Sequence, residues 1–317
     1  MTLTITLLII AGILCAWALA FAGAAVMPAK KTARPFMKAL KAPMVIAHRG
    51  DSRKFTENTM PAFSAAREAV PGCMLETDVW QTRDRAIVLS HDGTLESATG
   101  ETIPIGAMDL EQVMGMDAGF HITHDSGRTF PFRGQGHRVA TLEQALSAFP
   151  DALFSIDIKL NSMDFAGRVM DLIISHGAIS RVIVGSFYRD VLRFIRSEYP
   201  EVATGFSSRE TVLFYLMHRL RISGFFRCGG DVMMIPEFSD TEQPEYLGGN
   251  SDQGFRVVSQ SFIRSAHRAG YPVCVWTINR EENMRRLIMW GADGIITDYP
   301  EKLSAVISQS HLSEQQK

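Results

Sequence analysis

Residues 44–92 read MVIAHRGDSRKFTENTMPAFSAAREAVPGCMLETDVWQTRDRAIVLSHD. This stretch contains three apolar runs, and each run carries or ends in side chains that exchange protons or bind ions. Those side chains are His48, Arg49, Glu76, Asp78, His91 and Asp92. Short apolar runs bounded by turn residues are typical of buried strands. The pattern therefore predicts three strands with chemically active residues at or near their ends.

The spacing of Glu76 and Asp78 puts both carboxylates on one face of the second strand, because residues i and i+2 of a strand point the same way. Carboxylates side by side repel each other unless a proton or a cation lies between them. The chain is then expected to turn near residues 83–84 and to return antiparallel. This hairpin would bring Ser90 and His91 level with Glu76.

Eight apolar runs after Pro43 read as parallel strands, and helical patterns separate most of them. Alternating strands and helices over this length are typical of a TIM (β/α)8 barrel, an α/β fold whose active sites lie at the carboxyl ends of the strands. We expect the barrel over residues 43–308, with a small insertion over about 86–138 after the second strand. The expected strands are 44–47, 74–80, 153–159, 182–187, 202–206, 232–235, 273–278 and 294–297.

The order of the polar motifs resembles that of the glycerophosphodiester phosphodiesterases over roughly residues 44–303. The matching pieces are HRG at 48–50, ENT at 57–59, ETD at 76–78, HD at 91–92, DIK at 157–159, VWTIN at 275–279 and GIITDYP at 294–300. HRG alone would be a weak match, but the ordered set is specific. The resemblance implies a TIM barrel that hydrolyses phosphodiesters with a divalent metal ion.

By this resemblance, Glu76, Asp78 and Asp157 bind the metal ion. Carboxylate oxygens suit a hard cation, Mg²⁺ or Ca²⁺, and the sequence has no Cys or His cluster at zinc spacing. The family usually has Glu at the position of Asp157, so the shorter side chain would shift the ion or leave room for a water molecule. The alternative reading is that the three carboxylates form ion pairs with Arg49 and Lys159.

Two histidines, His48 and His91, are the candidate acid/base pair, because imidazole titrates near neutral pH. The alternative for each is a structural histidine. Arg49 and Lys159 are the candidates for holding the phosphate. Trp276 is expected to contact the alcohol part of the substrate, and the alternative is ordinary packing.

The first 29 residues contain no charged side chain, and the apolar run 3–27 is long enough to cross a bilayer. We expect a transmembrane helix over 1–29, a basic linker over 30–42 and a polar tail over 309–317. The basic residues after the helix predict a cytoplasmic catalytic domain by the positive-inside rule. The alternatives are a cleaved signal peptide and a linker whose cations are simply solvated.

Residues 211–226 form a second apolar segment, too short and too rich in Arg to span a bilayer. It reads as a barrel helix and a loop, or as a segment that lies on the membrane. The near-zero net charge gives no indication of a nucleic-acid partner, and no protein partner is evident. The four cysteines form no C-x-x-C pair, so a disulfide scaffold is not expected.

These features predict metal-dependent hydrolysis of a glycerophosphodiester to a phosphomonoester and an alcohol. The alternative substrate is a lysophospholipid, cleaved in a lysophospholipase D reaction. A non-catalytic, membrane-tethered binding barrel is the third hypothesis. It would be expected to lack one of the candidate histidines or carboxylates, whereas this sequence has all of them.

Overall fold

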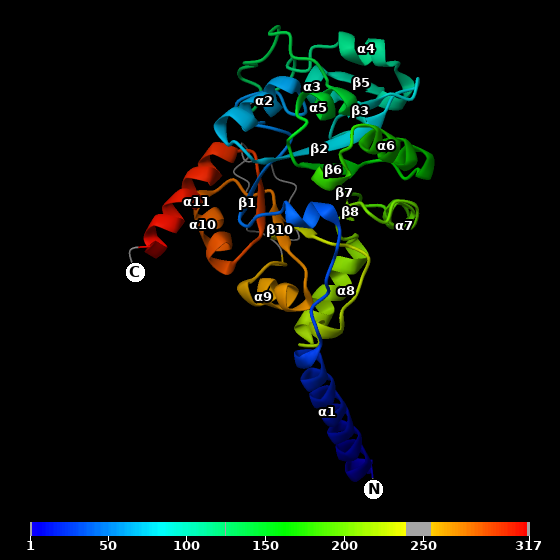
Figure 1. Ribbon diagram of the computed structural model, residues 1–317, viewed down its shortest axis with the longest axis vertical. Helices are drawn as coiled ribbons and strands as arrows, with labels where there is room; N and C mark the ends of the chain where they lie inside the picture. Colours follow the sequence, from blue (N-terminus) through cyan, green and yellow to red (C-terminus); the bar gives the residue numbers. More distant parts are fainter. Residues whose placement is uncertain (1, 124, 239–254, 316–317) are drawn as a thin grey trace.

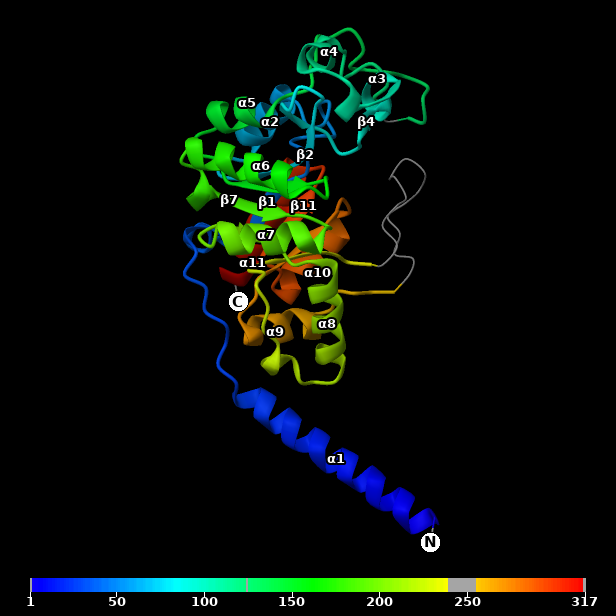
Figure 2. The ribbon, with the colours of Figure 1, turned by 90° about the vertical axis from the view of Figure 1, so that its right-hand side faces the viewer.

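The computed structural model describes residues 2–123, 125–238 and 255–315. Eight parallel strands form one curled sheet in the order β8-β7-β6-β2-β1-β11-β10-β9 (Figure 1; Figure 2). The two ends of the sheet meet at a parallel bridge between Gly205 and Val232, where the amide of Phe206 donates to Val232 O at 3.1 Å. The sheet is therefore that of a TIM-like barrel, as expected.

Each of the eight expected strands has a counterpart whose ends differ from the expected ones by at most two residues. They are β1 (Met44–Ala47), β2 (Met74–Gln81), β6 (Phe154–Ile158), β7 (Val182–Gly185), β8 (Ala203–Thr204), β9 (Met233–Pro236), β10 (Val273–Trp276) and β11 (Gly294–Thr297). The helices that cover the sheet are α2 (Met60–Ala69), α6 (Met163–Ser175), α7 (Arg189–Glu198), α8 (Ser208–Arg219), α9 (Gln260–Ala269), α10 (Glu281–Trp290) and α11 (Pro300–Gln315). The last helix continues into the expected polar tail.

Side chains of the strands alternate between the two faces of the sheet. Val45 and Ala47 of β1 pack in the large cluster beneath the helices, whereas Met44 and Ile46 pack inside the barrel. Phe36, from the short 3-10 helix η1 (Pro35–Lys38), joins the interior cluster and is only 1% exposed. Because its neighbours include residues where strands begin, Phe36 closes the amino end of the barrel.

The insertion after β2 builds a small subdomain with its own apolar cluster, which includes Leu95, Ile105 and Val113. It lies at the opposite end of the molecule from α1 (Figure 1; Figure 2). Its elements, with the helix that leads back to the barrel, are β3 (Ile87–Leu89), β4 (Thr94–Leu95), α3 (Glu96–Thr99), β5 (Glu101–Pro104), η2 (Ile105–Ala107), α4 (Leu110–Gly115) and α5 (Leu142–Ala148).

The hairpin of β2 and β3 forms, but its register differs from the expected one. Val79 pairs with Leu89, and the amide of Ser90 donates to the carbonyl of Asp78 at 3.1 Å. Ser90 is therefore level with Asp78, and the prediction that it lies level with Glu76 was wrong. The cause is a three-residue loop whose last residue, Arg85, adopts a left-handed conformation with φ 72°.

The amino-terminal helix α1 (Thr2–Val26) extends away from the barrel (Figure 1). It is long and apolar enough to cross a membrane, and none of its most apolar window is buried against the protein. A signal sequence near an amino terminus meets the same criteria of length and composition. Its carboxyl-terminal part contacts the barrel at the short helix η4 (Ser223–Phe225).

The linker after α1 is bound to the amino end of the barrel through Asp231, whose side chain is fully buried. Arg34 forms an ion pair with this carboxylate, Thr32 donates to it at 3.1 Å, and Lys30 lies 3.5 Å away. The amide of Thr204 donates to the other carboxylate oxygen at 2.9 Å. We call Lys30, Thr32, Arg34 and Asp231 the linker cluster.

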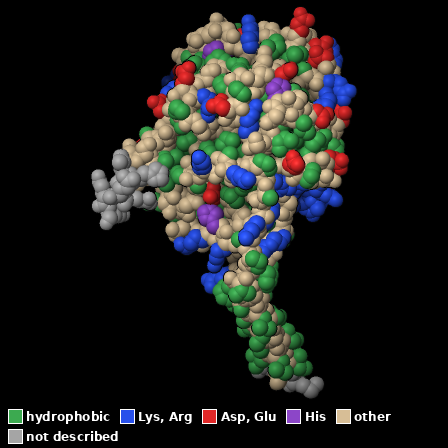
Figure 3. Space-filling view, in the orientation of Figure 1, with side chains coloured by type: hydrophobic (Ala, Val, Ile, Leu, Met, Phe, Trp, Pro, Cys, Tyr) green, Lys and Arg blue, Asp and Glu red, His purple; other side chains and the backbone are tan. Residues whose placement is uncertain are grey.

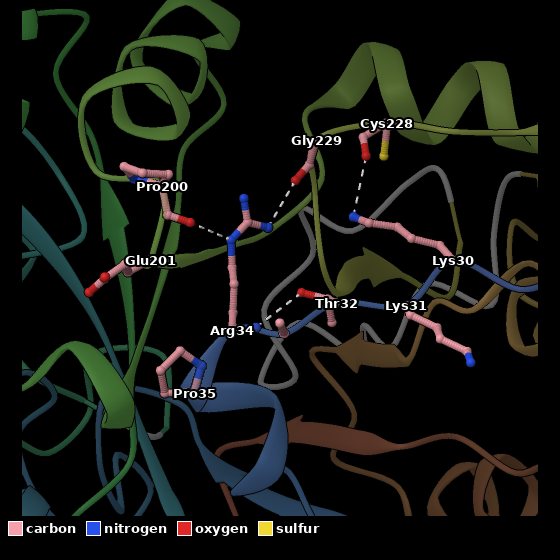
Figure 4. Close-up of a pocket in the computed structure, with 10 residues that line it drawn as sticks. Lys30, Lys31, Thr32, Arg34, Pro35, Pro200, Glu201, Cys228 and Gly229 are labelled. Carbon is pink, nitrogen blue, oxygen red and sulfur yellow. Dashed lines mark hydrogen bonds between the residues drawn. The ribbon is translucent and has the colours of Figure 1, made fainter.

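A cavity lies between the linker and the ends of two barrel loops (Figure 4). Its cations already have protein partners: Lys30 donates to Gly230 O at 2.6 Å, and Arg34 donates to Pro200 O at 3.1 Å and to Gly229 O at 3.3 Å. The alternative of a linker with simply solvated cations is therefore wrong for Lys30 and Arg34, although Lys31 is exposed.

Candidate active site

The candidate residues meet at the carboxyl ends of neighbouring strands, as the barrel predicts. His48 follows β1, Glu76 and Asp78 lie on β2, and Asp157 lies on β6. The register of β2 with β6 pairs Asp78 directly with Asp157. These residues come from distant parts of the sequence, so the order of strands in the sheet brings them together.

His48 is held by a carboxylate from the last strand connection. Its Nδ1 lies 2.6 Å from Oδ1 of Asp298, which also accepts a hydrogen bond from Ser52 Oγ at 3.1 Å. Asn279 Nδ2 donates to the other oxygen of Asp298 at 2.7 Å. Three segments of the chain, at residues 48–52, 279 and 298, thus meet at one imidazole ring.

Asp298 also determines which nitrogen of His48 carries a proton. Burial alone would raise the pKa of Asp298, but the charge and hydrogen bond of His48, with the bond from Asn279, lower this pKa to about 2. An ionised carboxylate only accepts hydrogen bonds, so Nδ1 of His48 must donate. The other nitrogen, Nε2, is therefore the one that can exchange a proton with a substrate.

The pKa of His48 is raised above its usual value. Burial and the charge of Arg49 lower it, but the charge and hydrogen bond of Asp298, together with the charge of Glu76, raise it by more. The imidazolium form is therefore favoured over a wider pH range than in a solvent-exposed histidine.

Beside His48, acidic and basic side chains are paired in a compact group. Lys159 Nζ lies 2.8 Å from an oxygen of Asp78 and 2.7 Å from an oxygen of Asp157. Arg49 Nη1 contacts both oxygens of Glu57, at 3.0 and 2.9 Å, and its Nε lies 3.4 Å from Asp78. Asp78 and Asp157 therefore form ion pairs with these cations, as the alternative to metal ligation predicted.

Glu76 differs from the other two carboxylates because it has no side-chain cation in contact among the described residues. Burial and the charge of Asp78 raise the pKa of Glu76 to about 7. Its oxygen accepts a hydrogen bond from the amide of Arg49 at 3.1 Å. Of the three carboxylates, Glu76 is thus the one whose negative charge is least compensated by contacting cations.

His91 lies after β3, at the start of the insertion, with its side chain 42% exposed. Its Nδ1 lies 2.9 Å from Asp92, and its carbonyl accepts a hydrogen bond from Trp80 at 3.2 Å. The amide of the preceding residue, Ser90, donates to the carbonyl of Asp78 at 3.1 Å, so the chain at His91 starts beside the carboxylate strand. Trp276, at the end of β10, packs partly buried against the barrel interior, so the packing expected as its alternative is present.

A model of the glycerophosphoryl diester phosphodiesterase family matches residues 48–302, which contain the whole group described above. The chain belongs to this family. The predicted family and the predicted enzyme class, a phosphoric diester hydrolase, are therefore confirmed. The matched range also contains Asp298 and Asn279, the two residues that hold His48.

Curated relatives cover most of the chain. The human lysophospholipase D GDPD1 is 28% identical over 278 residues, with 81% of this chain and 84% of that protein covered. A glycerophosphodiester phosphodiesterase of Caldanaerobacter subterraneus is 28% identical over 265 residues, covering 82% of this chain and 96% of that protein.

A solved structure shows the same fold. It is a phosphodiesterase of Oleispira antarctica in complex with the product sn-glycerol-3-phosphate, with a TM-score of 0.65 and 21% identity. The similarity covers 84% of this chain and 97% of that chain. At this identity the comparison establishes the fold alone.

The family generally uses a divalent metal, and the carboxylates fit one in their chemistry. Glu76, Asp78 and Asp157 offer only oxygen atoms, as Mg²⁺ and Ca²⁺ prefer. Asp78 Oδ2 is buried and accepts no hydrogen bond from the described part of the chain. Within that same part, no three His, Cys, Asp or Glu side chains converge as a ligand set, because the ammonium of Lys159 lies between Asp78 and Asp157.

The turn of the HRG motif is shaped by close packing on α2. Arg49 and Gly50 adopt positive φ angles of 57° and 89°. A Cβ atom on Gly50 would lie 2.7 Å from the backbone of Ala62, so a larger residue does not fit. The glycine thus allows the strand end to turn sharply and to present His48 and Arg49 at the rim of the barrel.

The motifs alone do not indicate the partners of His48 and Arg49. Asp298 and Asn279 lie within the GIITDYP and VWTIN motifs, and an Asp at the end of the last strand lies beside the first strand in any closed barrel. Glu57, of the ENT motif, pairs with Arg49.

Seven histidines match no motif and are therefore expected to be surface or loop residues. His137 does lie in a loop, but it is buried and its Nδ1 lies 2.8 Å from the hydroxyl of Thr56. His124 and the side chain of His311 lie outside the described residues. The remaining four, His121, His176, His218 and His267, are exposed or half-buried.

Proposed function

We propose that the protein hydrolyses glycerophosphodiesters to a glycerol 3-phosphate-type phosphomonoester and a free alcohol. The observation that carries this proposal is the position of His48, fixed by Asp298 next to a buried group of carboxylates and cations at the rim of the barrel. An acid/base group beside paired cations is what a phosphodiester needs, because the substrate is an anion and its leaving group must be protonated.

His48 exchanges a proton through Nε2, since Nδ1 donates to Asp298. His91, which follows β3, supplies the second acid/base group. Arg49 and Lys159 hold the phosphoryl oxygens once the substrate anion competes for them with Asp78 and Glu57. Trp276 contacts the alcohol from the end of β10.

Glu76, Asp78 and Asp157 would hold a divalent cation, Mg²⁺ or Ca²⁺. When bound, such an ion neutralises charge on the phosphoryl group and lowers the pKa of a hydroxyl that it contacts. For the ion to reach all three carboxylates, Lys159 must leave its position between Asp78 and Asp157, and the substrate phosphate offers it a new partner.

The test uses the full chain in lipid nanodiscs and measures alcohol release from glycerophosphocholine with Mg²⁺, Ca²⁺ or EDTA. We expect metal-dependent turnover in the wild type and a loss of 10²-fold or more in His48→Ala, about the usual contribution of a general acid or base. His267→Ala, which changes a half-exposed histidine away from the motifs, is the control and should retain activity. No turnover by a folded, metal-loaded wild type would favour the binding-barrel hypothesis.

A second candidate substrate is a lysophospholipid, and the observation that favours it is α1, whose apolar length suits a membrane span. The relative named lysophospholipase D adds a precedent within the family. Lysophosphatidylethanolamine embedded in the same nanodiscs provides the comparison. Faster release of ethanolamine than of choline from glycerophosphocholine would select this branch.

The domain arrangement belongs to the same proposal: a transmembrane helix over 1–29, a linker over 30–42 and a barrel over 43–308. The barrel would lie on the cytoplasmic side. Five basic residues follow the helix and favour this side by the positive-inside rule: Lys30, Lys31, Arg34, Lys38 and Lys41. Protease digestion of sealed vesicles, with a tag after Lys317, would report the side on which the barrel lies.

A further inference from the structure

Helix α8 exposes apolar side chains where a water-facing helix normally carries polar ones. Phe214 faces the core and is fully buried. The opposite side carries Val212, Leu213, Leu216 and Leu220, with exposed fractions of 60%, 52%, 54% and 53%. At 3.6 residues per turn these four side chains fall within one sector of roughly 100°. We call these four residues the α8 face.

This feature is specific to α8 among the neighbouring barrel helices. The solvent side of α7 exposes Arg189, Asp190 and Arg193, and that of α9 exposes Arg264 and His267. Both helices follow the usual pattern of an apolar inner side and a charged outer side. The exposed apolar side of α8 therefore needs a separate explanation.

The end of α8 lies directly against α1. Trp17 of α1 donates a hydrogen bond from Nε1 to the carbonyl of Leu220 at 2.9 Å. Phe225 of η4 packs so closely on α1 that a Cβ atom on Gly23 would lie 2.9 Å from its ring. Figures 1 and 2 show α1 leaving the barrel beside α8 and α9.

The length of α1 determines the depth of this contact. Its 25 residues extend about 37 Å, which leaves only about 7 Å outside a hydrocarbon core of about 30 Å. Trp17 is nine residues before Val26, or about 14 Å from the end of the helix. If α1 crosses a bilayer, Trp17 and the end of α8 therefore lie at least about 7 Å below the edge of the core. Helices that lie on a membrane are buried about 5–10 Å into the boundary between head groups and acyl chains. The depth expected for the end of α8 is similar.

Cationic side chains surround the same contact. Arg219, Arg221 and Arg227 are exposed, and Arg227 also donates to the carbonyl of Pro28 at 2.6 Å, just after α1. Figure 3 shows Lys and Arg side chains around the junction of the apolar helix with the barrel. Long basic side chains next to buried apolar ones reach up to anionic lipid head groups.

We propose that the α8 face, together with Phe225, inserts into the interfacial region of the bilayer that α1 crosses, with the three arginines at its anionic head groups. The barrel then lies on the membrane along α8 and is not merely tethered to it. The inference depends on α1 as a membrane span and does not depend on the proposed catalytic reaction.

The test places a fluorophore at selected sites of the full chain in nanodiscs of phosphatidylcholine and phosphatidylglycerol. The parent carries Cys15→Ser, because Cys15 is exposed whereas Cys73 and Cys274 are buried. Leu216→Cys reports on the α8 face. Ile174→Cys is the matched control, because Ile174 is also an exposed apolar residue, 43% accessible, on α6. The labelled parent without a new cysteine gives the background from Cys228.

We expect lipids with a nitroxide on the acyl chain to quench the fluorophore at position 216 at least threefold more than at position 174. The emission at 216 should also move to shorter wavelength. Leu213→Cys repeats the measurement in case Leu216→Cys does not fold. Equal, weak quenching at 213, 216 and 174 in folded protein would overturn the proposal, whether or not the protein hydrolyses phosphodiesters.

Discussion

His48 and Asp298 form the most tightly defined pair of the candidate site. Their contact joins the residue after the first strand to the residue after the last, and it is reinforced by a backbone bond from the His48 amide to Thr297 O at 3.0 Å. The pair exists because the barrel closes β11 onto β1. Asp298 is a positioning residue, since it acts through the imidazole ring.

Asp298→Asn should change both the rate of turnover and its pH profile. Removing the negative charge removes a cause that raises the pKa of His48, so the limb of the profile that reports His48 should shift to lower pH. The change should appear in kcat/KM measured across pH 5–9. A lowered rate with an unshifted profile would show that Asp298 contributes only structure.

Glu76 makes the metal-free protein sensitive to pH. Its raised pKa means that folded Glu76 keeps its proton up to about pH 7, whereas in the unfolded chain the group loses its proton near its ordinary pKa of 4.5. The folded state binds more protons in this window, so stability falls as pH rises through it. The effect is on the order of 1–3 kcal/mol.

Glu76→Gln should therefore raise the melting temperature in EDTA at pH 8, because it removes the repulsion with Asp78. In the wild type, adding Mg²⁺ or Ca²⁺ should raise the melting temperature at the same pH, and the variant should lose most of that increase. Thermal melts of both proteins, with and without metal, provide the comparison. An equal metal response in both would remove Glu76 from the ligand set.

Residue types and spacing were enough to predict which groups gather at the rim, because a barrel brings strand ends together wherever they occur in the sequence. They were not enough to predict the pairing within the group. Lys159 lies between Asp78 and Asp157, and Glu57 turns to Arg49, because each choice depends on distances of a few ångströms.

At the scale of elements, the linker cluster shows how a short basic segment becomes part of the fold. Asp231 precedes β9 and would be a buried, unpaired charge without the linker. Lys30, Arg34 and Thr32 supply its partners. The segment is therefore joined to the barrel by an internal ion pair, which is screened by salt much less than a surface pair.

Asp231→Asn should destabilise the protein by about 3–5 kcal/mol, the usual cost of removing one partner of a buried ion pair. Asp190→Asn on α7 is the matched control, since Asp190 forms only an exposed pair with Arg193 at 3.9 Å and should change stability by less than about 1 kcal/mol. Urea denaturation of the two variants measures both values. Similar small losses in both would mean that the linker cluster contributes little.

The strands and long helices of the barrel could be predicted because they show apolar runs or periods, and several of the helices begin at a capping residue such as Thr59, Ser162 or Ser259. The register of the β2–β3 hairpin could not, because it depends on the left-handed conformation of Arg85. The short elements of the insertion were also missed. Segments such as α3 (Glu96–Thr99) are too short to show a period.

At the scale of the whole molecule, the folded barrel includes residues that precede 48–302, the range that the family model matches. Phe36 fills the amino end of the barrel, and the linker cluster covers the neighbouring loops. Closure of eight strands was predictable from their number and order. The docking of residues 30–38 was not, because nothing in a basic linker sequence indicates which carboxylate it will meet.

The fragment 28–317 should melt at a higher temperature than the fragment 42–317. The shorter fragment lacks Phe36, whose burial contributes roughly 1.5–3 kcal/mol, and it leaves Asp231 buried without its cations. Differential scanning calorimetry in detergent measures the difference. Equal melting temperatures would show that residues 28–41 are not part of the folded barrel.

The linker cluster has a consequence for how such an enzyme would meet its substrate. If α1 crosses a bilayer, the buried ion pair leaves the barrel almost no tether length, so the barrel cannot reach out into solution or to an opposing membrane. Its encounters with bilayer lipids are then two-dimensional and depend on lateral diffusion. Diluting a lipid substrate with inert lipid should therefore slow turnover even when the bulk concentration of the substrate is unchanged.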